Sequence, residues 1–299
     1  MHIPDDTMIK CHLCGNDKIR LKYSLELCKI YQCQHCKLVF TDQKSLKHKQ
    51  GKDMYSEDYF TVTHPNFFKA SGVDYPKYLK NSKKLQTFLR EVKILKKHKP
   101  NGKLLDIGCA TGVFLDMAKK EGFDTFGVEL SEYAAKHAAE KFKLNVFNGK
   151  LEDSKFKKES FDVITMWDFI EHVPDPVSIL KKARELLKDD GIMVIQTIND
   201  DSLMCKMADK IYKYTNGKIS KPAALVHPIH HITHFSKRTL FHMLHNVNLK
   251  PVHVEYSEIP LDNVEGSLIT KVAVVGIYTA AWLVNSPFEM KVVVKKTQS

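Results

Sequence analysis

Arginine is scarce in this 299-residue chain, which has it at four positions, 20, 90, 184 and 238. The 46 basic residues and the net charge of +11 are therefore almost entirely due to lysine. Proteins that read phosphate groups favour the planar guanidinium fork of arginine over the ammonium group of lysine. A lysine excess spread along the chain consequently favours a solvated basic surface over a dedicated nucleic-acid or phosphate-binding face.

The sequence also lacks a long apolar run. Its longest, Val272–Val284, has 13 residues, whereas about 20 are needed to cross a bilayer. The first residues, Met-His-Ile-Pro-Asp-Asp, lack the basic and apolar segments of a secretory signal. We therefore expect a cytoplasmic protein without stable membrane insertion, in which 272–284 packs on the rest of the molecule.

The seven cysteines include two C-x-x-C pairs, with 18 residues between the pairs. Without a secretion signal, such pairs indicate a reducing compartment and metal binding rather than disulfides. Four thiolates satisfy the tetrahedral preference of Zn²⁺ and leave no position for water. The spacing predicts a structural zinc ribbon over residues 1–42, with the ligands Cys11, Cys14, Cys33 and Cys36.

The stretch 103–115 reads Lys-Leu-Leu-Asp-Ile-Gly-Cys-Ala-Thr-Gly-Val-Phe-Leu. Its apolar run, 104–107, predicts a buried parallel strand, and the glycines predict a turn into a helix. Gly108 and Gly112 let the backbone approach a ligand, and the N-terminus of the helix points at that ligand. Glu129 ends the next predicted strand, about 20 residues beyond the turn, where a carboxylate can hold a ribose hydroxyl.

Strands and helices alternate from residue 103 onward, which predicts a parallel sheet with helices on both faces. Asp175 and Pro176 are expected to open a helix as its N-cap and first residue. Asp189-Asp190-Gly191 is expected to turn into a buried strand, and Ser236 to cap a later helix. The predicted strands are 103–107, 123–129, 144–147, 161–166, 192–198, 251–256 and 289–295, the last two at sheet edges, with a helix around 85–95 before them.

Three segments resemble a known family. Leu-Asp-Ile-Gly-Cys-Ala-Thr-Gly at 105–112, followed by Gly-Val-Glu-Leu-Ser at 127–131, is similar to the glycine motif and acidic second strand of class I S-adenosylmethionine-dependent methyltransferases. Residues 161–176 resemble the fourth strand and following loop of that family. The resemblance spans residue 11 to the end and departs at Ala110, where the family often has glycine.

The resemblance implies an α/β fold, a Rossmann-like seven-stranded sheet with helices on both faces and an antiparallel last strand at 289–295. It divides the chain into the ribbon at 1–42, a linker or lid at 43–76, and a methyltransferase domain at 77–299 whose residues 222–287 cap the acceptor side. Ribbons followed by a segment like Tyr-Ser-Glu-Asp-Tyr-Phe, 55–60, resemble a subfamily associated with sugar and polysaccharide tailoring.

Ligands of such sheets bind beyond the carboxyl ends of the strands, and the resemblance assigns residues there to the cofactor S-adenosylmethionine. The glycine turn would frame its methionine part, Glu129 would hold its ribose, and Leu130 would lie against its adenine. Trp167 and Asp168 would close the floor near the sulfonium, and plain core is the alternative for Trp167. The implied cofactor-binding set is Asp106, Gly108, Cys109, Ala110, Gly112, Glu129, Leu130, Asn148, Leu151, Trp167 and Asp168.

Histidine supplies the candidate catalytic bases. A hydroxyl acceptor must lie about 3–3.5 Å from the methyl group and lose its proton, and imidazole is the natural base near neutral pH. His172 matches the loop after the fourth strand, and His231 lies where the family borders its acceptor pocket. A hydrogen-bonded loop histidine is the alternative for each. The four histidines between 227 and 234 also leave open a metal site, with His227, His230 and His231 as its best-spaced ligands.

The leading hypothesis is a methyltransferase that uses S-adenosylmethionine and structural zinc to methylate an oxygen of a small molecule, such as a saccharide, a nucleotide sugar or another polar compound. One alternative is an RNA methyltransferase guided by the ribbon, although the ribbon lacks the arginine and aromatic clustering expected for base stacking. The other is a non-catalytic ribbon protein that binds nucleic acid or a partner. The intact turn and Glu129 argue against the latter, because a vestigial pocket has no need of them.

Overall fold

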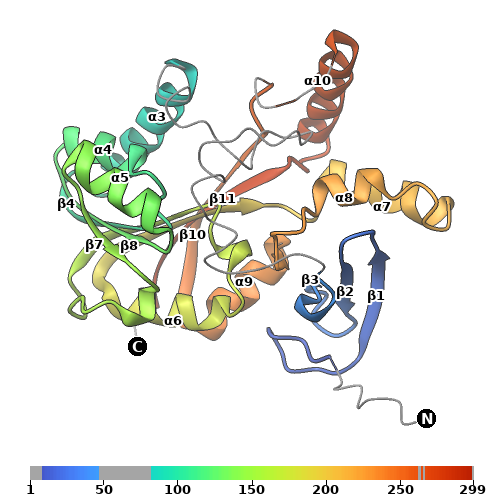
Figure 1. The fold of residues 1–299 in the computed structure, drawn as a ribbon, viewed down its shortest axis with the longest axis horizontal. Coiled ribbons are helices and arrows are strands. Elements are labelled where there is room, and N and C mark those ends of the chain that lie inside the picture. Colours follow the sequence, from blue (N-terminus) through green and yellow to red (C-terminus); the bar gives the residue numbers. More distant parts are fainter. Residues whose placement is uncertain (1–8, 47–81, 262–263, 265–266, 298–299) are drawn as a thin grey trace.

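The computed structural model describes residues 9–46, 82–261, 264 and 267–297. These residues form a seven-stranded sheet in the order β10-β11-β8-β7-β4-β5-β6 and a four-stranded sheet in the order β1-β2-β3-β9 (Figure 1). The predicted α/β fold with a seven-stranded sheet is thereby confirmed. The strands of the large sheet are β4 (Gly102–Ile107), β5 (Phe123–Glu129), β6 (Asn145–Asn148), β7 (Phe161–Trp167), β8 (Leu187–Ile198), β10 (Leu249–Ser257) and β11 (Glu289–Lys296).

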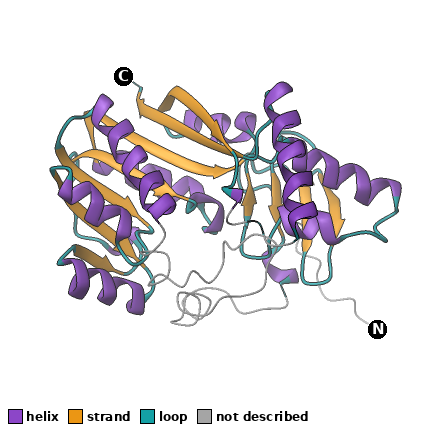
Figure 2. Cartoon of the chain, turned by 90° about the horizontal axis from the view of Figure 1, so that it is seen from above, coloured by secondary structure: helices purple, strands orange, loops and turns teal. Residues whose placement is uncertain are grey.

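Helices pack on both faces of the large sheet (Figure 2). Leu104 of β4 shares one apolar cluster with helices α3, α4 and α5, and Leu105 shares another with α6 and α9. Neighbouring residues of a strand point to opposite faces, and each of these buried leucines contributes about 2 kcal/mol. The helices are α3 (Ser82–His98), α4 (Val113–Lys120), α5 (Glu132–Phe142), α6 (Pro176–Leu186), α7 (Leu203–Tyr214), α8 (Lys221–Val226), α9 (Lys237–Asn246) and α10 (Leu268–Leu283), with the short turns η1 (Gln43–Ser45), η3 (Leu151–Asp153) and η4 (Ile170–His172).

The order of the strands reverses at β4. This strand pairs in parallel with β5 on one side and with β7 on the other, and the chain continues outward to β6 and β8 respectively. Ligands of open parallel sheets bind at the carboxyl ends beside such a reversal. The turn after β4 and the loops after β5 and β7 therefore lie at the binding edge.

The last strand, β11, pairs antiparallel with both β8 and β10. This confirms its antiparallel direction, but its expected position at an edge is wrong, because β10 alone takes that edge. Val292, Val293 and Val294 are all at most 1% exposed. Consecutive apolar residues buried on both faces are typical of an internal strand. The run of three valines in the sequence was therefore the signal that this strand lies inside the sheet.

The strand β8 begins at Leu187, earlier than predicted. Its pairing with β7 shifts register between Leu187 and Ile192, so Asp189-Asp190-Gly191 is an irregularity inside the strand and not a turn before it. The two carboxylates are held by lysines, Asp189 by Lys296 at 2.9 Å and Asp190 by Lys99.

Two predicted helix starts are confirmed. The Asp175 side chain accepts a hydrogen bond from the Ser178 backbone N–H at 3.0 Å, with Pro176 as the first residue of α6. Ser236 forms a capping box with Thr239 at the start of α9. Such caps satisfy backbone donors that a helix leaves unpaired at its first turn.

The small sheet joins the N-terminal segment to a segment far along the chain. Three antiparallel strands, β1 (Ile19–Ser24), β2 (Lys29–Cys33) and β3 (Val39–Thr41), come from the cysteine-rich N-terminal segment, which we call the ribbon. The fourth strand, β9 (Thr233–His234), comes from the histidine-rich segment far along the chain and pairs with β3. In Figure 1 the blue ribbon consequently lies close to the orange helices α7 and α8.

Most of the apolar stretch 272–284 forms α10. The expectation that it packs on the rest of the protein is correct for one side of this helix. Val274 and Ala281 are buried, whereas Val272 and Leu283 are 64% and 82% exposed. None of the described helices combines the length and the apolarity that a bilayer crossing requires. Residues 47–76 of the predicted linker or lid, which include the segment 55–60, lie outside the described residues. The boundaries between the ribbon, this linker and the methyltransferase domain therefore remain predictions.

Candidate functional site

The turn between β4 and α4 has three residues in the left-handed region, with φ of +78° at Gly108, +48° at Ala110 and +83° at Gly112. A Cβ at Gly108 would lie 2.5 Å from Phe169 Cδ2, and one at Gly112 would lie 2.7 Å from the Cβ of Ala138. Both glycines are therefore required by packing within the protein as well as by backbone angle. Sequence reasoning missed Phe169, which covers Gly108.

The substitution Gly112→Ala is expected to destabilise the fold by about 3 kcal/mol, because a left-handed backbone costs an alanine about 1 kcal/mol and overpacking against Ala138 costs about 2 more. Gly122→Ala is the matched control, since Gly122 has φ of +99° but open space around its Cβ position. Urea unfolding of both variants measures the difference. Equal losses would show that the contact with Ala138 is unimportant.

Glu129 links the turn to the end of β5. Its Oε2 accepts a hydrogen bond from the Ala110 N–H at 2.9 Å, and its Oε1 accepts one from the Ser131 N–H at 2.7 Å. The residue is only 7% exposed, so Glu129 is not a solvated acid at a strand end. Burial raises the pKa of Glu129, although these two backbone N–H groups oppose the rise. Each oxygen keeps a second lone pair for a ligand hydroxyl.

Asp106, near the end of β4, and Cys109, within the turn, are both buried. Asp106 is 2% exposed and accepts a hydrogen bond from the Thr165 hydroxyl of β7 at 2.7 Å. Burial raises its pKa to about 8, and the charge of Glu129 adds to the rise. Burial also raises the pKa of the Cys109 thiol. Asp106 therefore links β4 to β7 through its side chain, and its contact with the cofactor stays a prediction.

The loop after β6 meets the end of β5. The Asn148 side chain donates hydrogen bonds to the backbone carbonyls of Glu129 and Leu130, at 2.9 and 3.2 Å. Leu130 is half-buried, and Leu151 is buried. The structure thus brings together the glycine turn, Glu129 and Asn148, as the sequence predicted for one binding edge.

Trp167 lies in the apolar cluster shared with α3 and α4. Its ring meets Phe114 edge-on at 5.1 Å between centroids, and the Lys291 ammonium lies 5.9 Å from it. These contacts favour the core alternative for Trp167. Asp168, the next residue, is open to solvent, yet surrounding protein atoms desolvate it and raise its pKa to about 6, although Gln196 donates a hydrogen bond to it at 3.3 Å.

The histidines separate into two groups. His172, His230 and His231 lie together, with ring centroids 4.7 to 5.2 Å apart. Desolvation lowers the pKa of His172 to about 4 and that of His230 to about 3, and it also lowers the pKa of His231 well below its ordinary value. All three are therefore neutral at pH 7.

His227 does not share a metal site with His230 and His231, so the grouping suggested by sequence spacing is wrong. Its Nε2 lies 2.6 Å from the Asp200 carboxylate, and its Nδ1 lies 3.1 Å from the Ala223 carbonyl. Both ring nitrogens of His227 therefore lie within hydrogen-bonding distance of acceptors inside the protein. His172, distant in sequence, takes its place beside His230 and His231.

The ribbon is bound to this region by polar contacts that sequence reasoning missed. Lys22 of β1 pairs with Asp200, which follows β8, at 3.4 Å. Thr41 of β3 donates its hydroxyl hydrogen to the His231 carbonyl at 2.7 Å. These contacts join residues far apart in sequence, and no local pattern signals them.

Asp200→Asn is expected to lower the free energy of unfolding by about 3 kcal/mol, because it leaves the Lys22 ammonium buried without its countercharge. Burial alone would raise the pKa of Asp200, but Lys22 and His227 hold it far below its ordinary value. This contribution is therefore complete above about pH 4 and is lost as the pH falls. Urea unfolding at pH 7 and pH 3 tests both statements, with the exposed Asp201→Asn as control; an unchanged midpoint at pH 7 would contradict them.

The four predicted zinc ligands lie together. The Sγ atoms of Cys11 and Cys36 are 3.5 Å apart, those of Cys14 and Cys33 are 3.6 Å apart, and all four lie within 4.8 Å of one another. A tetrahedral Zn²⁺ with bonds of about 2.3 Å spaces its sulfurs about 3.8 Å apart. The donors and their spacing therefore fit zinc. Cys28 is buried in a separate apolar cluster.

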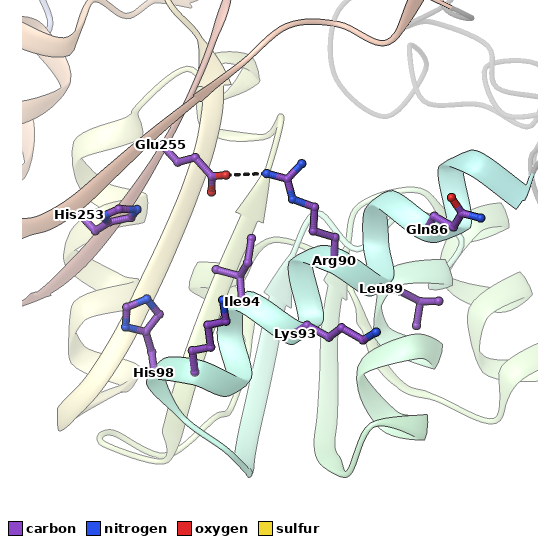
Figure 3. Close-up of a pocket in the computed structure, with 9 residues that line it drawn as sticks. Gln86, Leu89, Arg90, Lys93, Ile94, His98, His253 and Glu255 are labelled. Atoms are coloured by element: carbon purple, nitrogen blue, oxygen red, sulfur yellow. Dashed lines mark hydrogen bonds and ion pairs between the residues drawn. The ribbon is translucent and has the colours of Figure 1, made fainter.

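A groove lies elsewhere, between α3 and β10 (Figure 3). Arg90 and Lys93 line it from α3, and His253 and Glu255 line it from β10; Arg90 pairs with Glu255 at 2.9 Å. None of the residues predicted to bind the cofactor lines this groove. It is therefore not the predicted methyl-donor site.

Known proteins match this chain over the region of the site. A family described as "Methyltransferase domain" matches residues 77–254. The "Ubiquinone biosynthesis O-methyltransferase" of Actinobacillus pleuropneumoniae serotype 7 is 36% identical over 107 residues, which are 32% of this chain and 46% of that protein. The protein of the same name from Histophilus somni is 32% identical over 145 residues, 42% of this chain and 61% of the relative. The chain thus spans about half the length of these relatives.

A solved structure shares the fold. An S-adenosylmethionine-dependent methyltransferase from Archaeoglobus fulgidus superposes with a TM-score of 0.51 at 21% identity, over 74% of this chain and 98% of that chain. The family match includes β4, β5, β7 and the turn between β4 and α4, where the candidate site lies. The chain belongs to the methyltransferase-domain family whose model matches residues 77–254, more than half of its length, and it shares the fold of a solved S-adenosylmethionine-dependent methyltransferase.

Proposed function

We propose that the protein transfers the methyl group of S-adenosylmethionine to a hydroxyl oxygen of a small polar acceptor, such as a saccharide or a nucleotide sugar. The observation that carries the proposal is the neutral, half-buried His172 beyond the carboxyl end of β7. Its Nδ1 lies 3.1 Å from the His230 carbonyl, so Nδ1 holds a proton and Nε2 can accept one from a hydroxyl. The name of these relatives, ubiquinone biosynthesis O-methyltransferase, supports oxygen as the atom methylated.

The cofactor would lie across the turn at 108–112, with its ribose hydroxyls on Glu129. When bound, it supplies the activated methyl group. The protein's own contribution is position: Glu129 fixes the nucleoside, and Asn148 ties the neighbouring loop to the carbonyl of Glu129. Most of the rate of such a transfer comes from holding acceptor and methyl group in line.

The four cysteines would hold a structural zinc ion. A closed four-sulfur site leaves no coordination position for water or substrate, so zinc there cross-links the ribbon and takes no part in the transfer. The ribbon in turn contacts the histidine-rich segment through β3 and β9. Its proposed role is therefore to complete the wall of the acceptor side.

Transfer of labelled methyl from S-adenosylmethionine into a pool of nucleotide sugars, compared with RNA, tests the acceptor class. We expect label in the small molecules and none in RNA; label in RNA alone would replace this proposal with the RNA methyltransferase. His172→Ala and His231→Ala should slow turnover about 100-fold without changing the affinity for S-adenosylhomocysteine measured by calorimetry. His242→Ala, at an exposed position of α9, is the control. Unchanged turnover in both test variants would remove histidine as the base.

A further inference from the structure

We propose that His172, His230 and His231 bind a divalent transition-metal ion whose open coordination position takes the acceptor oxygen. We call these residues the three-histidine site. The role of the acceptor rests on the proposed O-methylation, whereas the binding of the metal does not.

The geometry of the cluster suits a metal ion. One ring nitrogen from each residue lies within 4.8 Å of the others, on two segments that are far apart in sequence. Neutral imidazole is a ligand for zinc, iron, cobalt, nickel and copper. Three protein ligands with a fourth position open are typical of a reactive metal site, in contrast to the closed four-cysteine set.

The ligands are already oriented. The carbonyl of His230 can only accept a hydrogen bond, so the His172 Nδ1 that lies 3.1 Å from it carries the proton and Nε2 keeps its lone pair. A backbone hydrogen bond of 2.8 Å from the Ile232 N–H to the Glu171 carbonyl ties η4 to the histidine-rich segment. Bonds of this kind to the groups around a metal fix ring orientation and strengthen binding.

The ribbon adds a third anchor. The Thr41 hydroxyl donates to the carbonyl of His231 at 2.7 Å, and it also lies 3.1 Å from Nε2 of His234. His234 thereby has a partner within the protein and is not offered as a ligand. Between described residues, by contrast, no hydrogen bond uses a ring nitrogen of His230 or His231, so their lone pairs are available.

The position of the cluster connects it to the acceptor. His172 lies just beyond the carboxyl end of β7, beside the reversal of strand order where ligands of this fold bind. A metal ion there would bind an acceptor hydroxyl and lower its pKa, as bound metals do for water. The three histidines would then act as ligands, which replaces the direct role of His172 as the base, and a solvent base would take the proton.

Cobalt titration of the purified full-length protein tests the site. After dialysis without strong chelators, Co²⁺ is added while visible absorption is recorded. We expect one Co²⁺ per chain with d–d bands but without thiolate charge-transfer absorption, which would mark the cysteines. His230→Ala should bind Co²⁺ at least about tenfold more weakly, whereas the exposed His242→Ala should match the unaltered protein. His230→Gln, which keeps a polar group at this half-buried position, serves as a second variant, and circular dichroism verifies that each protein is folded.

Absence of a nitrogen-bound Co²⁺, or a Co²⁺ affinity in both His230→Ala and His230→Gln equal to that of the unaltered protein, would overturn the proposal. Neither result involves cofactor or acceptor, so it leaves the O-methylation untouched. Conversely, Co²⁺ bound at this site in a protein that methylates no hydroxyl would retain the metal site and remove the proposed function. Turnover equal in His230→Ala and the unaltered protein would overturn the role of the metal in acceptor binding.

Discussion

Glu129→Gln is expected to weaken the binding of S-adenosylhomocysteine by about 100-fold. A hydrogen bond to a charged acceptor contributes about 1.5–3 kcal/mol, and a loss near 2.7 kcal/mol corresponds to that factor. The effect should be large because the carboxylate is only 7% exposed. A ribose hydroxyl that is desolvated at this buried position loses its hydrogen bonds to water. It therefore depends on a strong acceptor, such as a carboxylate, to replace them.

The structure adds a second reason. Both carboxylate oxygens accept a backbone N–H, from Ala110 on one side and Ser131 on the other. A glutamine side chain has one oxygen and one NH₂ group, so its NH₂ must face one of these two donors. The turn itself should therefore loosen, and urea unfolding without ligand measures that part separately from binding by calorimetry.

Asp124→Asn is the matched control, because Asp124 is an exposed carboxylate on the same strand. It should bind S-adenosylhomocysteine like the unaltered protein. If Glu129→Gln also binds normally, the ribose does not lie on Glu129. If Glu129→Gln lowers the free energy of unfolding and the free energy of ligand binding by the same amount, Glu129 acts only by holding the turn in place.

Local signals predicted the parallel part of the sheet well. Strand β5 has the predicted bounds, Phe123–Glu129. In β4, the apolar run 104–107 marks a buried strand without reference to the rest of the chain. The glycine turn and the caps at Asp175 and Ser236 are local in the same sense. Each depends on backbone angles and hydrogen bonds within a few residues.

Features that depend on long-range pairing were not predictable. Nothing near Thr233 indicates that it will pair with Phe40 of the ribbon, since a two-residue strand has no periodicity to read. His172 likewise meets His230 only because η4 and the histidine-rich segment are brought together by the fold. The spacing of His227 relative to His230 pointed to a different trio, and the strong acceptor Asp200 removes His227 from it.

Removal of the ribbon metal is expected to abolish methyl transfer while leaving cofactor binding almost unchanged. Structural zinc contributes on the order of 10 kcal/mol to the folding of such modules, so Cys33→Ser should unfold the ribbon. Loss of β3 removes the partner strand of β9 and the hydrogen bond from Thr41 to the carbonyl of His231. The turn at 108–112 and Glu129 have hydrogen bonds of their own within the large sheet, which the ribbon does not supply.

Cys28→Ser is the control, because Cys28 is a buried cysteine of the same ribbon that lies outside the four-sulfur cluster. Zinc content, limited proteolysis, calorimetry with S-adenosylhomocysteine and turnover are measured on both variants. In Cys33→Ser we expect less than one zinc per chain, cleavage within the ribbon, unchanged affinity and turnover at least about 100-fold lower, as for loss of a positioned catalytic group. Full turnover by a protein whose ribbon is cleaved would mean that the histidines keep their positions without β3, and the ribbon would then serve a purpose separate from the chemistry.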